Sequence, residues 1–273
     1  MTDKTYENIK IERDGEVTFL VLNRPEKRNA MSPGLHYDVE DALTWLDDDK
    51  QTKVLVLAGA GDAWCAGQDL KLYFRETANN PAERKKSNTA SHHWRHEILT
   101  RFSKPTIAMV NGYCFGGAFT QVCACDIAIA SDTATFGLSE VNWGVIPGGI
   151  VSWNIAELLN HRDAMFYAMT GLPFDGKKAA EIKLVNYSVP ADQLRDETVK
   201  IAKLLMEKNP TTLRYTKEAV RHVRGMSHDQ AYNFLGAKLL ALQQVDKEKG
   251  MQKGLNEFLD TKTYKPGFGE FKR

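Results

Sequence analysis

The stretch of sequence that decides the fold is Pro105-Thr106-Ile107-Ala108-Met109-Val110-Asn111-Gly112-Tyr113-Cys114-Phe115-Gly116-Gly117-Ala118-Phe119. It opens as a buried strand over 105–110, passes through a glycine-rich turn and ends where a helix is predicted to begin. The chain uses the same plan once before, because the buried strand predicted at 53–58 is followed by Trp64-Cys65-Ala66-Gly67-Gln68-Asp69-Leu70. The sequence therefore contains two strand-to-glycine junctions, each leading into a helix.

Both junctions place backbone N–H groups at a helix N-terminus, where they have no partner within the helix. Such groups suit an anion or a developing oxyanion, and glycine lets a ligand approach the backbone closely. Two junctions can aim two N–H groups at one carbonyl oxygen, which is what an oxyanion hole requires. The glycine pattern alone is at least as compatible with two ordinary turns between a strand and a helix.

The rest of the chain divides into a half with alternating strands and helices and a half with helices alone. Apolar residues at helical spacing predict a helix over 33–48, with Ser32 as its N-cap. Further strands are predicted at 6–13, 17–23, 126–131 and 134–137, and further helices at 69–75, 81–102, 151–159, 162–169, 176–182 and beyond 192. This order predicts an α/β core with a C-terminal helical extension. Apolar residues on more than one face of 229–259 predict packing against another subunit.

Composition excludes several classes of function. The 36 basic and 35 acidic residues nearly cancel, so no overall field favours nucleic acid or an anionic membrane. No apolar run reaches the roughly 20 residues that span a bilayer, and the charged N-terminus does not resemble a secretory signal. Four cysteines in apolar surroundings are too few for a disulfide scaffold and predict buried thiols. We therefore expect a cytoplasmic protein.

One carboxylate stands out in Phe136-Gly137-Leu138-Ser139-Glu140-Val141-Asn142-Trp143-Gly144. Because Glu140 is flanked by apolar side chains, it is a candidate for a desolvated acid/base with a raised pKa. The alternative is a structural glutamate satisfied by a backbone or arginine partner. The basic turn at 24–29 is either a solvated loop or a site for a substrate's phosphates. His92 and His96 are one helical turn apart without an evident third ligand, so no metal site is predicted.

Four motifs together resemble the crotonase (enoyl-CoA hydratase/isomerase) superfamily. They are Asn23-Arg24-Pro25-Glu26-Lys27-Arg28-Asn29-Ala30-Met31, Ala66-Gly67-Gln68-Asp69-Leu70, Lys104-Pro105-Thr106-Ile107-Ala108-Met109-Val110-Asn111-Gly112 and Phe136-Gly137-Leu138-Ser139-Glu140. The resemblance implies a crotonase-type ββα spiral core that binds acyl-CoA, residues 1–205, and a C-terminal α-helical trimerisation region, residues 206–273. It also implies a homotrimer or a hexamer of two trimers, with no nucleic-acid or membrane partner.

By this resemblance, the N–H groups of Gln68 and Gly117 form the oxyanion hole for the substrate thioester, and no cofactor is needed because coenzyme A is part of the substrate. Hydratases of the superfamily carry two catalytic glutamates, but Thr120 occupies the first position here and only Glu140 is retained. One glutamate with a hydroxyl residue is similar to the branch of hydratase-lyases acting on 4-hydroxycinnamoyl-CoA (feruloyl-CoA), in which that residue is a serine. Their reaction yields an aromatic aldehyde, vanillin from feruloyl-CoA, and acetyl-CoA.

The same resemblance assigns the remaining site residues. The coenzyme A and acyl contacts are implied to be Lys27, Ala66, Leu70, Ser139 and Trp143. Tyr73 is implied to bind the phenol oxygen, while the branch's second phenol-binding tyrosine is replaced by Gly236, with Tyr232 one helical turn earlier. Two alternatives stay open: an enoyl-CoA hydratase or isomerase with another aryl or alkyl substrate, and a non-catalytic acyl-CoA- or RNA-binding member of the fold.

Overall fold

The computed structural model of the chain describes residues 4–263, and their contacts divide them into two units. The first unit comprises the described residues up to Phe102 together with Thr106–Ala202, and the second comprises Ser103–Pro105 and the described residues from Lys203 onward. The predicted functional division at 205/206 stays a prediction. No helix between Lys4 and Thr263 is both long and apolar enough to cross a membrane.

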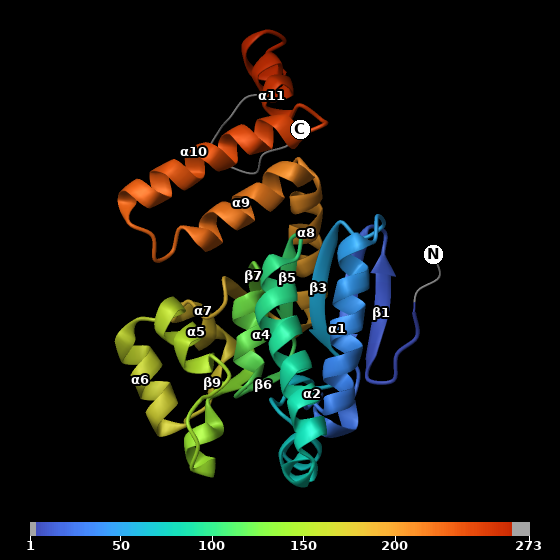
Figure 1. Cartoon of the computed structure of the whole chain (residues 1–273), viewed down its shortest axis with the longest axis vertical. Helices are drawn as coiled ribbons and strands as arrows, with labels where there is room; N and C mark the ends of the chain where they lie inside the picture. The colour runs from blue at the N-terminus through green and yellow to red at the C-terminus, as the bar shows by residue number, and fades with distance from the viewer. Residues whose placement is uncertain (1–3, 264–273) are drawn as a thin grey trace. The chain divides into compact units, whose positions relative to one another are not determined.

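The first unit is built on a six-stranded sheet (Figure 1). Its strands, in spatial order, are β1 (Ile9–Asp14), β2 (Val17–Leu22), β3 (Val54–Gly59), β5 (Thr106–Val110), β7 (Ile127–Ser131) and β10 (Tyr187–Val189). Only the β1–β2 pair is antiparallel, and the other neighbours are parallel. Parallel strands are covered on both faces and therefore form continuous apolar runs. This confirms the strands predicted at 6–13, 17–23, 53–58, 105–110 and 126–131, whereas β10 was not predicted.

A second, four-stranded sheet lies beyond the ends of the first and corrects the prediction for the two junctions. Its strands are β4 (Ala63–Cys65), β6 (Tyr113–Phe115), β8 (Thr135–Gly137) and β9 (Phe174–Asp175), in that order. We predicted that each buried strand leads through a glycine turn to a helix, but a three-residue strand also lies between them in each case. Three residues are too few to show a period in the sequence. With them, each unit is strand–strand–helix, so the ββα core implied by the resemblance is confirmed.

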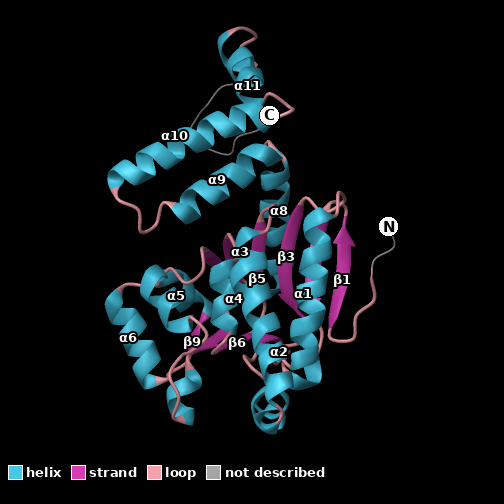
Figure 2. Ribbon diagram, in the orientation of Figure 1, coloured by secondary structure: helices cyan, strands magenta, loops and turns pink. Residues whose placement is uncertain are grey.

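Helices cover both faces of the large sheet (Figure 2). Helix α1 (Pro33–Asp48) begins where predicted, because Pro33 is its first residue and the Ser32 side chain accepts a hydrogen bond from Leu35 N–H. Its apolar face shares one core cluster with β2 and β3. On the opposite face, Arg195 of α8 (Leu194–Met206) stacks 4.1 Å from the Phe19 ring centroid. The sheet is thus buried on both sides.

The remaining helices of the first unit are η1 (Pro25–Lys27), η2 (Leu70–Arg75), η3 (Glu76–Asn79), α2 (Pro81–His92), η4 (His93–Ile98), α3 (Leu99–Arg101), α4 (Ala118–Ala124), η5 (Ser139–Trp143), α5 (Val151–Leu158), α6 (His161–Thr170), α7 (Gly176–Glu181) and η6 (Ala191–Gln193). The predicted helices are present among them, but the one predicted at 81–102 is divided into three elements and the short helices η1, η3, η5 and η6 were not predicted. The predicted helix at 69–75 has π geometry, as does η4. The π-helix η2 directly follows the first junction, and the π-helix η4 directly follows α2.

The second unit contains the helices α9 (Pro210–His222), α10 (His228–Val245) and α11 (Gly250–Leu259). Lys238 of α10 forms an ion pair with Glu218 of α9, so these two helices pack together. The apolar tail treated as one stretch at 229–259 is interrupted, because Lys249 adopts a left-handed conformation between α10 and α11. Leu239, Leu240 and Met251 are more than half exposed. The predicted trimerisation role of this unit stays a prediction.

Candidate active site

The two glycine junctions lie in van der Waals contact. Strands β4 and β6 pair in parallel with Cys65 opposite Cys114, which brings the segments that follow them side by side. A Cβ built on Gly117 would lie 3.6 Å from Gln68 Cγ, and one built on Gly67 would lie 2.8 Å from the Phe115 carbonyl oxygen. The loops that the sequence analysis paired are therefore neighbours in space.

The N–H groups of Gln68 and Gly117 are free to bind a ligand. On either side of Gln68 the backbone is tied to Met31, whose N–H donates to the Gly67 carbonyl at 2.8 Å and whose carbonyl accepts from Asp69 N–H at 3.0 Å. Neither Gln68 N–H nor Gly117 N–H donates to any acceptor within residues 4–263. Two unpaired amides on touching loops are what the predicted oxyanion hole requires.

Glu140 lies against the second junction. Gly116 has a φ of 51°, and a Cβ there would lie 2.9 Å from Glu140 Oε1. Glu140 Oε2 is buried and has no hydrogen-bond partner in the described part of the chain. Burial raises the pKa of this carboxyl. No lysine or arginine pairs with the carboxyl group among these residues, but the backbone N–H of Glu140 itself hydrogen-bonds to it, so the alternative of a structural glutamate stays open.

The source of the desolvation differs from the prediction. We expected Leu138, Val141 and Trp143 to enclose the carboxyl group. Leu138 is fully buried, but Val141 is 42% exposed and Trp143 is 66% exposed. These two exposed side chains extend outward because η5 is a single short 3₁₀ segment that turns its acidic residue toward the backbone of Gly116. The close approach of the Gly116 backbone thus takes the place of the side chains of Val141 and Trp143.

Thr120 lies on the first turn of α4, directly after the second junction. Its N–H donates to the Gly117 carbonyl at 3.3 Å, which places it one turn from the proposed amide donor. Its hydroxyl donates to the Gly149 carbonyl, also at 3.3 Å, and the residue is buried. Thr120 therefore connects the helix start to the loop that follows Glu140.

A buried hydrogen-bond chain fixes the Gln68 side chain. Trp94 Nε1 can only donate, and it donates to His36 Nδ1 at 2.9 Å. His36 therefore carries its proton on Nε2, which donates to Gln68 Oε1 at 2.8 Å. Burial, followed by the charge of Arg95, lowers the pKa of His36 to about 3, so the ring is neutral. The Gln68 amide then donates to Ser91 Oγ at 3.3 Å.

We did not predict that His36, Ser91 and Arg95 belong to this site. The sequence feature that could have indicated them is a polar residue at a position that helical spacing assigns to the apolar face. His36 has the spacing of Val39 and Leu43 on α1, and Arg95 has that of Leu99. In the structure all three are buried.

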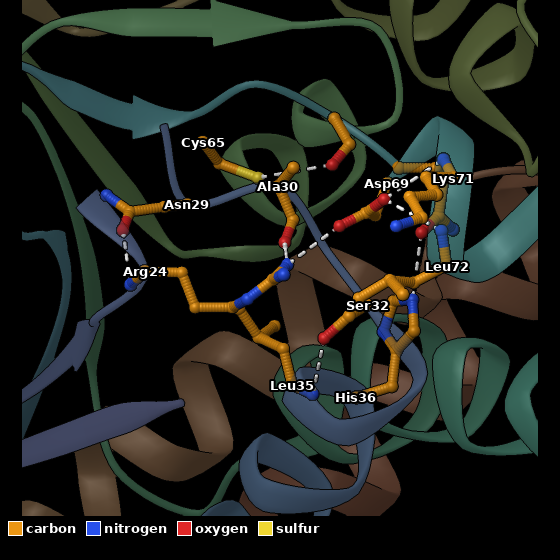
Figure 3. A network of polar contacts seen from close by, with 12 residues as sticks. Arg24, Asn29, Ala30, Ser32, Leu35, His36, Cys65, Asp69, Lys71 and Leu72 are labelled. Atoms are coloured by element: carbon orange, nitrogen blue, oxygen red, sulfur yellow. Dashed lines mark hydrogen bonds and ion pairs between the residues drawn. The ribbon is translucent and has the colours of Figure 1, made fainter. Parts of the chain in front are cut away.

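The basic turn at 24–29 supports the first junction from behind (Figure 3). The Arg24 guanidinium donates to the Ala30 carbonyl and forms an ion pair with Asp69 at 3.0 Å. Asp69 Oδ1 accepts from the N–H groups of Lys71 and Leu72 and so caps η2. Arg24 is buried, so this residue is neither part of a solvated loop nor a ligand for a substrate's phosphates.

The implied coenzyme A contacts lie around the two junctions. Ala66 N–H donates to the carbonyl of Arg28 at 2.9 Å, which holds the turn containing Lys27 beside the first junction. Lys27, Leu70 and Trp143 are exposed, and Ser139 is half-buried at the start of η5. Their assignment to coenzyme A stays a prediction.

Tyr73 is buried in η2 and its ring lies edge-on to His36, with ring centroids 5.3 Å apart. Its hydroxyl donates to Asn88 Oδ1 at 2.6 Å. Tyr232 lies on α10 of the second unit and is 75% exposed, while a Cβ at Gly236 would meet open space. Among the residues from Lys4 to Thr263, no three histidine, cysteine or acidic side chains group as a metal site.

This fold, with two backbone amides that lack acceptors on adjacent loops and a carboxyl group against one of those loops, is typical of enzymes that polarise acyl thioesters. The chain belongs to the enoyl-CoA hydratase/isomerase family, whose model matches residues 12–270. A hydroxycinnamoyl-CoA hydratase-lyase of Pseudomonas fluorescens is 47% identical over 269 residues, covering 98% of each chain.

More distant relatives support the same family. A mevalonyl-coenzyme A hydratase of Aspergillus fumigatus is 35% identical over 206 residues, covering 76% of this chain and 75% of its own. The solved structure of an enoyl-CoA hydratase from Bacillus anthracis matches with a TM-score of 0.85 at 26% identity. It covers 96% of this chain and 99% of its own.

Proposed function

We propose that the enzyme hydrates a 4-hydroxycinnamoyl-CoA, such as feruloyl-CoA, and then cleaves the product to an aromatic aldehyde and acetyl-CoA. The observation that carries this proposal is the partly desolvated Glu140 carboxyl group, whose Oε2 has no hydrogen-bond partner, against the loop that carries the Gly117 amide. The relative named hydroxycinnamoyl-CoA hydratase-lyase, 47% identical over nearly the whole chain, supports the choice of substrate.

In the hydration step, the N–H groups of Gln68 and Gly117 bind the thioester oxygen and stabilise the enolate. Glu140 accepts a proton from water as the water oxygen bonds to the β-carbon of the substrate. The same carboxyl then returns a proton to the α-carbon as the enolate collapses. A raised pKa suits both roles, because a group with a pKa nearer to neutrality both accepts and donates protons readily.

In the cleavage step, Glu140 takes the proton of the new β-hydroxyl group. The bond between the α- and β-carbons breaks, and its electrons return to the acetyl-CoA enolate held by the same two amides. Protonation of that enolate releases acetyl-CoA, and the β-carbon leaves as the aldehyde. Feruloyl-CoA plus water thus gives vanillin plus acetyl-CoA, with one oxyanion hole serving both enolates.

Tyr73 is the proposed partner of the 4-hydroxyl group. Because its own proton is donated to Asn88 Oδ1, its oxygen is left as an acceptor for the substrate's phenol. The role of Tyr232 as a second phenol contact stays a prediction from the resemblance, because Tyr232 belongs to the second unit.

Three further features belong to this proposal. The coenzyme A thioester site is lined by Lys27, Ala66, Leu70, Ser139 and Trp143. No other cofactor is needed. The exposed apolar residues of α10 and α11 support assembly into a trimer or a hexamer. All four cysteines are free thiols, which supports a reducing, cytoplasmic location.

The test is incubation of the purified protein with feruloyl-CoA. We expect loss of the conjugated thioester absorbance with formation of equal amounts of vanillin and acetyl-CoA. Crotonyl-CoA serves as the matched substrate without an aryl group. Accumulation of the β-hydroxy thioester without aldehyde would overturn the lyase assignment.

A second candidate is an enoyl-CoA hydratase or isomerase acting on another aryl or alkyl thioester. Two observations favour it: open space at Gly236, and commitment of the Thr120 hydroxyl to the Gly149 carbonyl. Faster turnover of crotonyl-CoA than of feruloyl-CoA would support this candidate against the lyase.

A further inference from the structure

Arg95 is a fully buried cation without an anionic partner. It lies on η4 with 4% of its surface exposed. Its guanidinium donates to the Ser91 carbonyl at 2.9 Å, to Ser91 Oγ at 2.5 Å and to the Gly117 carbonyl at 3.2 Å. No aspartate or glutamate lies within ion-pair distance of it in the described residues. Every acceptor that it uses is a neutral oxygen.

An unpaired buried charge is unfavourable, so its position needs an explanation. Burial lowers the pKa of Arg95 only to about 10, so the group stays protonated at neutral pH. A hydrophobic residue or a glutamine would fill this place on η4 without the cost of burying a charge. The compensating negative charge is therefore expected to arrive with a ligand.

The guanidinium points toward the oxyanion loop. A Cβ built on Gly117 would lie 3.6 Å from Arg95 Nη1, and one built on Gly149 would lie 3.9 Å from Nη2. Gly117 supplies one of the two proposed backbone N–H donors, and the carbonyl of Gly149 accepts a hydrogen bond from the Thr120 hydroxyl. The charge thus lies just behind the backbone that would hold the thioester oxygen.

Arg95 also contacts the other half of the oxyanion hole through Ser91. The Ser91 hydroxyl oxygen accepts hydrogen bonds from the Arg95 guanidinium and from the side-chain amide (Nε2) of Gln68. One arginine therefore fixes the backbone of Gly117 directly and the side chain of Gln68 through a single serine. Both residues that offer free N–H groups are connected to the same cation.

We propose that Arg95 is a positioning and electrostatic residue whose charge selectively stabilises the enolate oxyanion at Gln68 and Gly117. It does not touch the reacting atoms. It complements a negative charge that exists on the bound thioester only while the enolate exists, and it therefore stabilises the intermediate more than the substrate. This inference rests on the proposed function, because it requires an enolate to form.

The test uses acetoacetyl-CoA, whose enolate absorbs at longer wavelength than its keto form, and butyryl-CoA, which is a neutral ground-state probe. Arg95→Gln keeps a donor for the Gly117 carbonyl but removes the charge, and Arg95→Lys keeps the charge. Arg195→Met is the matched control, because Arg195 stacks on Phe19 on the opposite face of the sheet. A charge within about 4–6 Å shifts a pKa by about 1–3 units.

We expect the wild-type protein to bind acetoacetyl-CoA as the enolate and Arg95→Gln to weaken this preference at least about tenfold. Butyryl-CoA affinity should stay unchanged, Arg95→Lys should retain most of the enolate preference, and Arg195→Met should match the wild type. If Arg95→Gln does not fold, Arg95→Met carries the same expectation. An unchanged enolate preference in the neutral variant would overturn the inference.

The feruloyl-CoA assay separates this result from the proposed function. Normal production of aldehyde together with an unchanged enolate preference in Arg95→Gln overturns the role of Arg95 alone. Absence of aldehyde from the wild-type protein overturns the lyase function, while a charge-dependent enolate preference would still support the role of Arg95. A parallel loss of butyryl-CoA affinity would show a purely structural role and would also overturn the inference.

Discussion

Gly116→Ala offers a direct test of how the site holds Glu140. Gly116 has a φ of 51°, and its added Cβ would lie 2.9 Å from Glu140 Oε1 and 3.3 Å from Cδ. The atoms in the way are the end of a flexible side chain, so the steric conflict can be relieved by moving the carboxyl group. The variant is therefore expected to fold but to hold its acid/base in the wrong place.

The two effects of this substitution have different sizes. A left-handed conformation costs a non-glycine residue about 1–2 kcal/mol, which sets the expected loss in the free energy of unfolding. Displacement of a positioned acid/base costs about 10²–10⁴ in rate. Gly15→Ala is the matched control, because Gly15 has a φ of 60° and its Cβ would meet nothing within 4 Å.

Urea unfolding and feruloyl-CoA turnover measure the two effects separately. Both glycine variants should lose similar free energies of unfolding, while only Gly116→Ala should lose turnover, by about two orders of magnitude or more. Butyryl-CoA affinity should change little, because the carboxyl group is not part of the oxyanion hole. If Gly116→Ala turns over as fast as Gly15→Ala, contact with Gly116 does not position Glu140 and the reasoning is wrong.

Three further predictions concern the acid/base and its neighbour. Glu140→Gln should lower turnover of feruloyl-CoA by at least about two orders of magnitude, and a near-normal rate would return the non-catalytic alternative. The same variant should unfold at a higher temperature than the wild type at neutral pH, because burial raises the carboxyl pKa and the folded wild type holds a desolvated charge. That difference should close as the pH falls below the ordinary carboxyl value of 4.5, where both states are protonated; a difference that grows in acid would contradict the sign. Thr120→Val should reduce turnover less than Glu140→Gln, because Thr120 acts through the Gly149 carbonyl, and an unchanged rate would remove it from the mechanism.

The elements that the sequence predicted well are those whose signal is local. Helix α1 has apolar spacing, a serine cap and an initial proline, and the structure begins and ends it at the predicted residues. The parallel strands were predicted from short apolar runs, because both faces of such a sheet are covered. Strands β4 and β6 were missed because each has only three residues and exists through its partner strand. Pairing across a distance of about fifty positions leaves no local period to detect.

The site follows the same division. Glu140 and the two glycine loops could be proposed from adjacent residues, since a carboxylate and a glycine turn are visible as such. The burial of Arg95 and the protonation of His36 depend on contacts between η4, α1 and the loops. A single polar residue at an apolar position signals such a contact only weakly, because many such residues extend to solvent.

The small sheet explains why the missed strands matter for chemistry. An oxyanion hole works because its donors are fixed before charge develops, so that little energy is spent on reorganisation. Here the donors lie on separate loops, and the β4–β6 pairing between Cys65 and Cys114 sets the distance between those loops. Hydrogen bonds to and from the Met31 backbone hold one loop, and those that Thr120 and Arg95 donate hold the other. Rigidity at the two amides thus comes from backbone pairing, whereas the charge that favours the enolate comes from a side chain buried behind them.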